Sequence, residues 1–139
     1  MKKYEILDDI TADIGFIVYG KSLNELFENA AIAMFEVMID INSVEKSIEK
    51  IIEIESDSLE SLMYKWLNEL LYFVDSENLA FSEFKVDLNE EKLSLKAKCK
   101  GEKIDRNKHK IGTLVKACTY HQLKIWKENV WKAKIILDI

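Results

Sequence analysis

The amino-acid sequence predicts an α+β fold, in which two amphipathic helices pack on a mixed or antiparallel sheet. Two segments repeat apolar residues every three or four positions, as half-buried helices do, and the last third alternates apolar and polar residues, as strands do. The expected order of elements is ββ-α-β-α-ββββ. Because strands and helices do not alternate strictly in that order, a doubly wound parallel sheet is disfavoured.

The first part of the chain is predicted to form a strand pair and a helix. Short apolar runs at 4–7 and 14–19 predict two strands joined by a polar turn. Ser22 and Glu25 form a capping box, which satisfies free amides at the start of a helix over 23–38. One face of that helix carries its apolar residues, which are Leu23, Leu26, Phe27, Ala30, Ala31, Met34 and Met38.

The middle of the chain is predicted to form a third strand and a second helix. Alternating isoleucine and glutamate side chains indicate a strand over 48–55. Asp57 and Glu60 form a second capping box at the start of the helix. Its apolar repeat is the most regular in the chain and consists of Leu59, Leu62, Met63, Trp66, Leu67, Leu70, Leu71 and Val74.

The last third of the chain changes its apolar period from 3.6 to 2 and is predicted to contain four strands. They form two pairs: 84–88 with 93–99 around the turn Asn89-Glu90-Glu91, then 114–126 with 130–139 around Lys127-Glu128-Asn129. Antiparallel hairpins are the simplest way to join such neighbouring strands.

Length and composition predict a single domain over residues 1–139, because the chain has no proline, four glycines, and no repeat or linker. The formal charge of -5 disfavours a broad surface that neutralises nucleic-acid phosphates, so any contact with RNA is expected to be indirect. Seven cations nevertheless cluster together, namely Lys96, Lys98, Lys100, Lys103, Arg106, Lys108 and Lys110. We interpret them as a solvated strand face with a basic loop.

The sequence also bears on the compartment. It has no apolar core of a signal peptide and no run of about 20 apolar residues that could cross a membrane. We therefore expect a cytoplasmic protein without a membrane partner. Cys99 and Cys118 do not form a CxxC pair, and both lie in alternating apolar stretches, so they are expected to be buried, reduced thiols.

Signatures of catalysis are scarce. The chain has no G-x-S-x-G, no phosphate-binding glycine loop, no H-E-x-x-H and no cysteine set with zinc spacing. His109 and His121 are the two side chains available as general bases near neutral pH. A structural role is more common for a histidine on a strand, which is where His121 is expected.

Carboxylates offer a better candidate site. Asp8, Asp9 and Asp13 crowd one short loop, and Asp138 lies one residue from the end of the chain. Oxygen donors from separate segments suit a hard cation such as Ca²⁺ or Mg²⁺, and Ile139 can add an oxygen of its main chain or terminal carboxylate. The last five residues are largely apolar, which predicts a buried, structured end.

Several short blocks of sequence stand out along the chain. They are Thr11-Ala12-Asp13-Ile14-Gly15, Leu26-Phe27-Glu28-Asn29-Ala30-Ala31, Met34-Phe35-Glu36-Val37-Met38, Trp66-Leu67-Asn68-Glu69-Leu70-Leu71-Tyr72, Gly101-Glu102, Lys108-His109, Lys116-Ala117-Cys118-Thr119-Tyr120-His121 and Leu137-Asp138-Ile139. In their order and approximate spacing, these blocks resemble the archease family. The resemblance covers essentially the whole chain. Ile10 departs from it where the family usually has a histidine, and Leu114 departs where an acidic residue is common.

The resemblance implies a function and a site. Archeases are protein cofactors of the RNA ligase that joins tRNA exon halves through a guanylylated histidine, and they accelerate guanylylation and permit multiple turnover. They are not themselves the ligase. Asp13, Asp138 and Ile139 match the positions that bind a divalent cation in the family, for which Ca²⁺ is the first choice and Mg²⁺ or Mn²⁺ are alternatives. Glu28 and Glu36 are weaker candidates.

Two other functions are consistent with the sequence. The chain could be a metal-assisted hydrolase that uses Asp13 and Asp138 with His109 or His121 as a base. It could also be a general chaperone or assembly module whose adaptable surface is formed by Met34, Met38 and Met63. Those methionines fall on the apolar faces of the predicted helices, which favours their burial.

Overall fold

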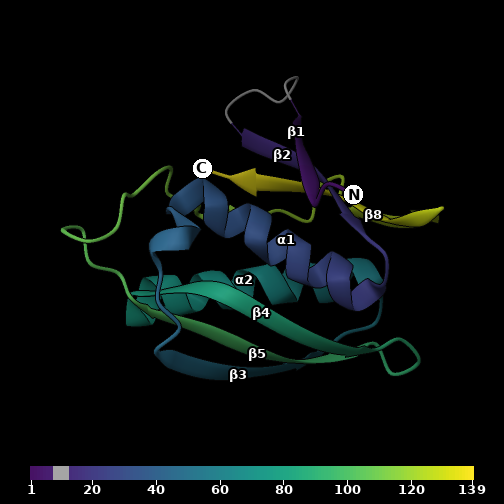
Figure 1. Ribbon diagram of the computed structural model, residues 1–139. Coiled ribbons are helices and arrows are strands. Elements are labelled where there is room, and N and C mark those ends of the chain that lie inside the picture. Colours follow the sequence, from purple (N-terminus) through teal and green to yellow (C-terminus); the bar gives the residue numbers. More distant parts are fainter. Residues whose placement is uncertain (8–12) are drawn as a thin grey trace.

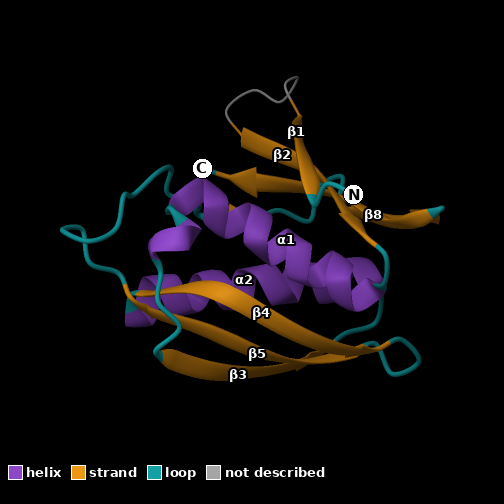
Figure 2. Ribbon diagram, viewed as in Figure 1, coloured by secondary structure: helices purple, strands orange, loops and turns teal. Residues whose placement is uncertain are grey.

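The computed structural model describes residues 1–7 and 13–139 and shows three layers, with two helices enclosed between two sheets (Figures 1 and 2). The predicted α+β class is confirmed, and every strand pairing in the described chain is antiparallel. The prediction of a single sheet was wrong, because the strands divide into a five-stranded and a three-stranded sheet.

The five-stranded sheet joins both ends of the chain. Its strands are β1 (Tyr4–Leu7), β2 (Asp13–Gly20), β6 (Ala117–Cys118), β7 (Lys124–Glu128) and β8 (Val130–Asp138). They follow the order β1-β2-β8-β6, and β7 also pairs with β8. The C-terminal strand β8 is therefore central in this sheet. β2 pairs with one edge of β8, and β6 and β7 pair with its other edge.

The three-stranded sheet comes from the middle of the chain. It has the order β3-β5-β4, formed by β3 (Ile48–Glu55), β5 (Ser94–Lys103) and β4 (Leu79–Asn89). Between the sheets lie α1 (Leu23–Met38) and α2 (Leu59–Glu77), and a short 3-10 helix, Ile41–Ser43, follows α1. α1 contacts β2 on one side and β4 on the other.

The position of α1 explains why its buried surface is wider than predicted. Beyond the apolar face expected from the sequence, Asn29, Ala33 and Phe35 are also buried. A helix that touches a sheet on each side must be apolar on two faces. Small alanines let the two sheets approach this helix, and one contiguous core of buried side chains spans all three layers.

The predicted helix starts were partly right. The Ser22 hydroxyl accepts a hydrogen bond from the Glu25 N–H at 3.1 Å, while the Glu25 carboxylate accepts one from the amide of Lys21 instead of Ser22. For α2, the expected box of Asp57 and Glu60 was wrong. Ser58 is the N-cap residue and exchanges hydrogen bonds with Ser61.

The predicted strand over 114–126 was also wrong, because it is two short strands separated by a turn. β6 ends at Cys118, the Leu123 N–H donates to the Tyr120 carbonyl at 3.2 Å, and Gln122 has a φ of 59°. This turn lets the chain leave the edge of β8 and return to it as β7. The final hairpin turn lies at Asn129, inside the predicted turn.

Two observations concern the predicted absence of a membrane span and the predicted state of the cysteines. In residues 1–7 and 13–139, no helix has the length and apolar character needed to span a membrane. Cys99 and Cys118 are free thiols and both are buried, as predicted. Burial raises the pKa of each thiol to about 12, so neither forms the reactive thiolate at neutral pH.

Candidate metal site

The antiparallel pairing of β2 with β8 places Asp13 directly opposite Asp138. Side chains of directly opposed residues have Cβ atoms about 4.5–5.5 Å apart, and two like charges at such positions destabilise a sheet. Both carboxylates are partly exposed, and neither forms an ion pair within residues 1–7 and 13–139. A cation shared by the two carboxylates would remove their repulsion.

The end of β8 is held firmly on its other edge. The Lys116 N–H donates to the Asp138 carbonyl at 2.7 Å, and the Thr119 N–H donates to the Ile136 carbonyl at 3.0 Å. Ile139 is half-buried and packs against the core. The predicted structured end is confirmed, because Ile139 directly follows the paired residue Asp138 and packs against the core.

β6 is itself clamped by α2. The side-chain amide of Asn68 donates to the Cys118 carbonyl at 3.1 Å, and its oxygen accepts from the Cys118 N–H at 2.9 Å. This pair of bonds replaces a neighbouring strand on the free edge of β6. Asn68 thus supports the strand that holds Asp138, a role that the sequence did not reveal.

The described part of the chain contains no group of three or more histidine, cysteine, aspartate or glutamate side chains placed to hold a metal. The donors predicted from the sequence remain Asp13, Asp138 and a main-chain oxygen of Ile139. All are oxygens, which fit a hard cation such as Ca²⁺ and not a soft one. Asp8 and Asp9, the other carboxylates of the predicted cluster, lie outside the described residues, as does Ile10.

The weaker glutamate candidates have structural partners elsewhere. Glu28 accepts a hydrogen bond from the Val86 N–H at 2.9 Å, and burial raises the pKa of Glu28. Asn24 accepts one from the Leu88 N–H at 2.8 Å. These two side chains of α1 close the free edge of β4, which would otherwise expose unpaired amides. Glu36 accepts a hydrogen bond from the Tyr4 hydroxyl at 3.2 Å.

His109 is buried and has both ring nitrogens in hydrogen bonds. Its Nδ1 accepts from the Asp105 N–H at 2.9 Å, so Nε2 carries the proton and donates to Glu102 at 2.9 Å. The expected strand position of His121 was wrong: it lies in the turn between β6 and β7, is exposed, and contacts Gln122. Neither histidine joins Asp13 and Asp138 in a grouping of the kind a metal-assisted hydrolase needs, within the described residues.

Glu102 is the centre of a network that the sequence did not predict. Its Oε2 accepts from the Glu45 N–H at 2.7 Å, and from the Lys108 ammonium and His109 at 2.9 Å each. The Glu45 amide, then Lys108 and His109, lower the pKa of Glu102 to about 2. The network fixes the start of the loop 104–116 that leads to β6.

The methionine faces considered as a chaperone surface are inside the protein. Met34, Met38 and Met63 are all buried, as their place on the apolar repeats predicted. Within the described structure, three of the seven cations of the basic stretch form ion pairs with nearby glutamates. Lys96 pairs with Glu53, Lys100 with Glu83, and Lys108 with Glu45 and Glu102.

Comparison with known proteins gives a consistent result. Residues 4–139 match the family model described as the Archease protein family. The chain is 46% identical to Protein archease of Sulfurisphaera tokodaii over 140 residues, covering all of both chains. It is also 46% identical to Protein archease of Pyrococcus abyssi over 143 residues, again covering both completely.

A solved structure supports the same assignment. The solution structure of Methanobacterium thermoautotrophicum protein 1598 is similar to this chain with a TM-score of 0.87 and 45% identity, and the match covers all of both chains. The sequence blocks, the fold and the relatives agree. The chain belongs to the archease family.

Proposed function

We propose that this protein activates a tRNA-splicing RNA ligase of the guanylylated-histidine type, promoting guanylylation of the ligase and multiple turnover in the joining of tRNA exons. The chain is not the ligase in this proposal. Family membership supports this role. Both cysteines and His109 are buried, and His109 accepts a hydrogen bond from the Asp105 amide, so these side chains have structural roles.

A divalent cation held by Asp13, Asp138 and Ile139 is part of the proposal. The observation that carries it is the register of β2 and β8, which sets two carboxylates opposite each other at the end of the chain. Bound there, the cation could be delivered to the metal site of the ligase or shared with it. Alternatively, it could order the surface of this protein that docks on the ligase. Ca²⁺ is the first choice, with Mg²⁺ and Mn²⁺ as alternatives.

The test is multiple-turnover joining of split tRNA by the cognate ligase with GTP and divalent metal. Wild type is expected to stimulate joining. Asp138→Asn is expected to stimulate at least about tenfold less, because its neutral amide oxygen binds a divalent cation more weakly than a carboxylate does. Asp87→Asn is the matched control, since it removes an exposed carboxylate from β4.

Each result has a separate meaning. Equal stimulation by Asp138→Asn and wild type would refute the metal site while leaving the ligase role intact. Absence of stimulation by wild type would refute the ligase role. Turnover of a phosphodiester by the protein alone would instead support the hydrolase alternative.

A further inference from the structure

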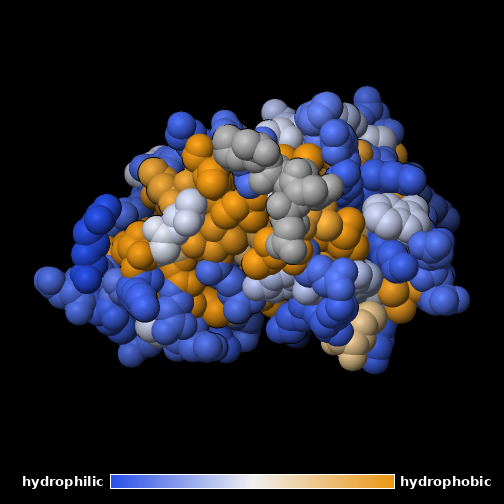
Figure 3. Space-filling model, turned by 90° about the horizontal axis from the view of Figure 1, so that it is seen from above, coloured by the Kyte–Doolittle hydropathy of each residue, from blue (hydrophilic) through white to orange (hydrophobic). Residues whose placement is uncertain are grey.

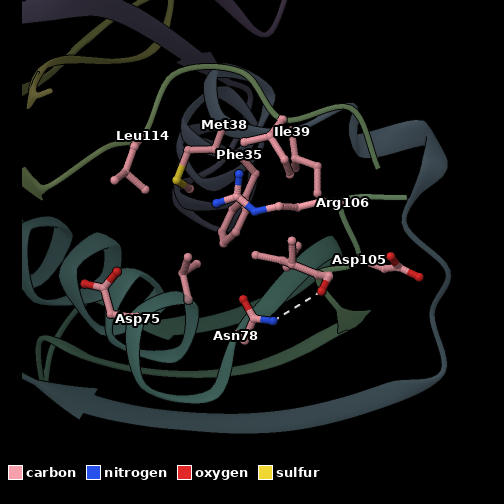
Figure 4. Close-up of a pocket in the computed structure, with 12 residues that line it drawn as sticks. Phe35, Met38, Ile39, Asp75, Asn78, Asp105, Arg106 and Leu114 are labelled. Atoms are coloured by element: carbon pink, nitrogen blue, oxygen red, sulfur yellow. Dashed lines mark hydrogen bonds between the residues drawn. The ribbon is translucent and has the colours of Figure 1, made fainter. Parts of the chain in front are cut away.

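A preformed apolar pocket lies between the C-terminal ends of α1 and α2 and the loop 104–116 (Figure 4). Its volume is about 560 Å³, within the range of pockets that bury a drug-sized group. Phe35, Met38, Ile39 and Ala80 form buried walls. Leu114 is part of the rim and is 64% exposed, which folding alone does not require.

Arg106 is the cation of this pocket. Figure 4 shows its guanidinium extended over the apolar floor near Phe35 and Met38, whereas the carboxylate of Asp105 points away. Among the described residues Arg106 forms no ion pair, in contrast to Lys96, Lys100 and Lys108 of the same basic stretch. Asp75 stands on the α2 side of the pocket. A guanidinium over apolar walls favours a planar anion such as a carboxylate.

The wall that carries Arg106 is well anchored. The Gly112 N–H donates to the Met38 carbonyl at 2.8 Å, and the Thr113 N–H donates to the Val37 carbonyl at 2.9 Å. A Cβ on Gly112 would lie 2.5 Å from the Val37 carbonyl oxygen, so this close approach requires glycine. With the Glu102–His109 contact on its other side, the loop holds the pocket open before any ligand binds.

The same loop connects the pocket to the candidate metal site. Leu114 lies two residues before Lys116, whose N–H binds the carbonyl of Asp138. The face of the molecule where β2 and β8 run, uppermost in Figure 1, also shows a broad apolar area in Figure 3. A partner that reaches the end of β8 would therefore meet apolar surface around it.

We propose that the pocket is a docking anchor for the ligase and receives apolar side chains from a ligase segment whose neighbouring carboxylate pairs with Arg106. This inference rests on the proposed function and adds a contact surface to it. The exposed rim at Leu114 favours a protein segment over a small molecule, because it extends the apolar contact beyond the pocket. Buried apolar anchors with an arginine at their edge are typical of strong interface contacts.

The first variant tests the charge. Binding of the immobilised cognate ligase is measured by biolayer interferometry, and Arg106→Gln is expected to raise the Kd about tenfold, with a smaller effect at high salt. Lys110→Gln is the matched control, because it removes an exposed cation from the same loop at a position that does not line the pocket. The control is expected to bind within about twofold of wild type.

The second variant tests the apolar rim. Leu114→Asn is expected to raise the Kd roughly three- to tenfold, because it removes apolar contact without adding charge. Ile51→Asn is the control, since Ile51 is 47% exposed on β3 and does not line the pocket. Binding of both pocket variants within twofold of wild type would overturn the docking proposal alone. Failure of wild type to bind the ligase at all would overturn the proposed function and the docking proposal with it.

Discussion

At the scale of single residues, Glu102 is a carboxylate whose pKa lies well below its usual value, and its environment explains why. Three donors converge on one carboxylate: the Glu45 amide, the Lys108 ammonium and His109. They favour the ionised form and lower the pKa of Glu102 to about 2. The Gly101-Glu102 and Lys108-His109 blocks of the sequence are thus two halves of one structural contact.

This pKa predicts how stability depends on pH. The folded pKa lies below the unfolded value of about 4.3, so the stabilisation by Glu102 is complete above that value and is lost as pH falls towards 2. We expect Glu102→Gln to be less stable than wild type at pH 7, with a difference that shrinks between about pH 4 and pH 2. Urea denaturation at a series of pH values measures it.

Glu49→Gln is the control for this measurement, because Glu49 is an exposed glutamate of β3 without an ion pair in the described structure. Its stability difference from wild type is expected to stay small at every pH. A constant difference between Glu102→Gln and wild type from pH 7 to pH 2 would show that the carboxylate charge does not stabilise the fold.

At the scale of elements, side chains of the two helices replace missing strand neighbours. Asn24 and Glu28 of α1 bind amides of β4, and Asn68 of α2 binds both backbone groups of Cys118 in β6. Trp66 donates from its indole nitrogen to the Phe27 carbonyl at 3.0 Å and joins the helices. Side chains of the two helices therefore close a free edge in each of the two sheets.

The clamp on β6 leads to a prediction. Asn68→Ala removes both hydrogen bonds to Cys118 and leaves its backbone groups without those partners, which is expected to cost roughly 1–3 kcal/mol of unfolding free energy. Hydrogen exchange at the Cys118 amide should accelerate more than at β4 amides. The control is Glu69→Ala on the same helix, where the side chain forms no hydrogen bond within the described structure. This variant should change both the exchange rate and the unfolding free energy less than Asn68→Ala does.

If the Cys118 amide in Asn68→Ala exchanged as slowly as in wild type, β6 would be held by β8 alone. The hydrogen bonds between Asn68 of α2 and Cys118 would then contribute little to the stability of β6 and β8. Joint measurement of exchange and unfolding separates this outcome from a general loss of stability.

At the scale of the whole molecule, the candidate site joins the two chain ends. Asp13 lies near the start and Asp138 near the end, so a bound cation would tie β2 to β8 in the folded state only. A ligand that binds the folded state stabilises it by RT ln(1 + [L]/Kd), about 2.7 kcal/mol at a hundredfold excess over Kd. Ca²⁺ is therefore expected to raise the melting temperature of wild type.

The matched experiment uses Asp138→Asn and Asp87→Asn in the same titration. The first variant should lose the rise with Ca²⁺, and the second should keep it. An unchanged melting temperature for wild type at millimolar Ca²⁺, Mg²⁺ and Mn²⁺ would contradict the site without reference to any ligase activity.

The local elements were largely predictable from sequence. The apolar repeats of α1 and α2 and the alternation in β3 to β5 depend on which face of each element is buried, and that information is periodic in the sequence. The family resemblance was also available from short blocks, and the comparisons confirm it. Single-domain organisation remains a prediction.

The sequence by itself determined the helices, most strands, the α+β class and the family, because each follows from local periodicity or from blocks of neighbouring residues. Only the tertiary structure decided that the strands form two sheets, that Asp13 faces Asp138, and that Arg106 projects over an apolar pocket. These features depend on register and on contacts between segments that are far apart in the sequence, and no local pattern specifies which strand edges meet.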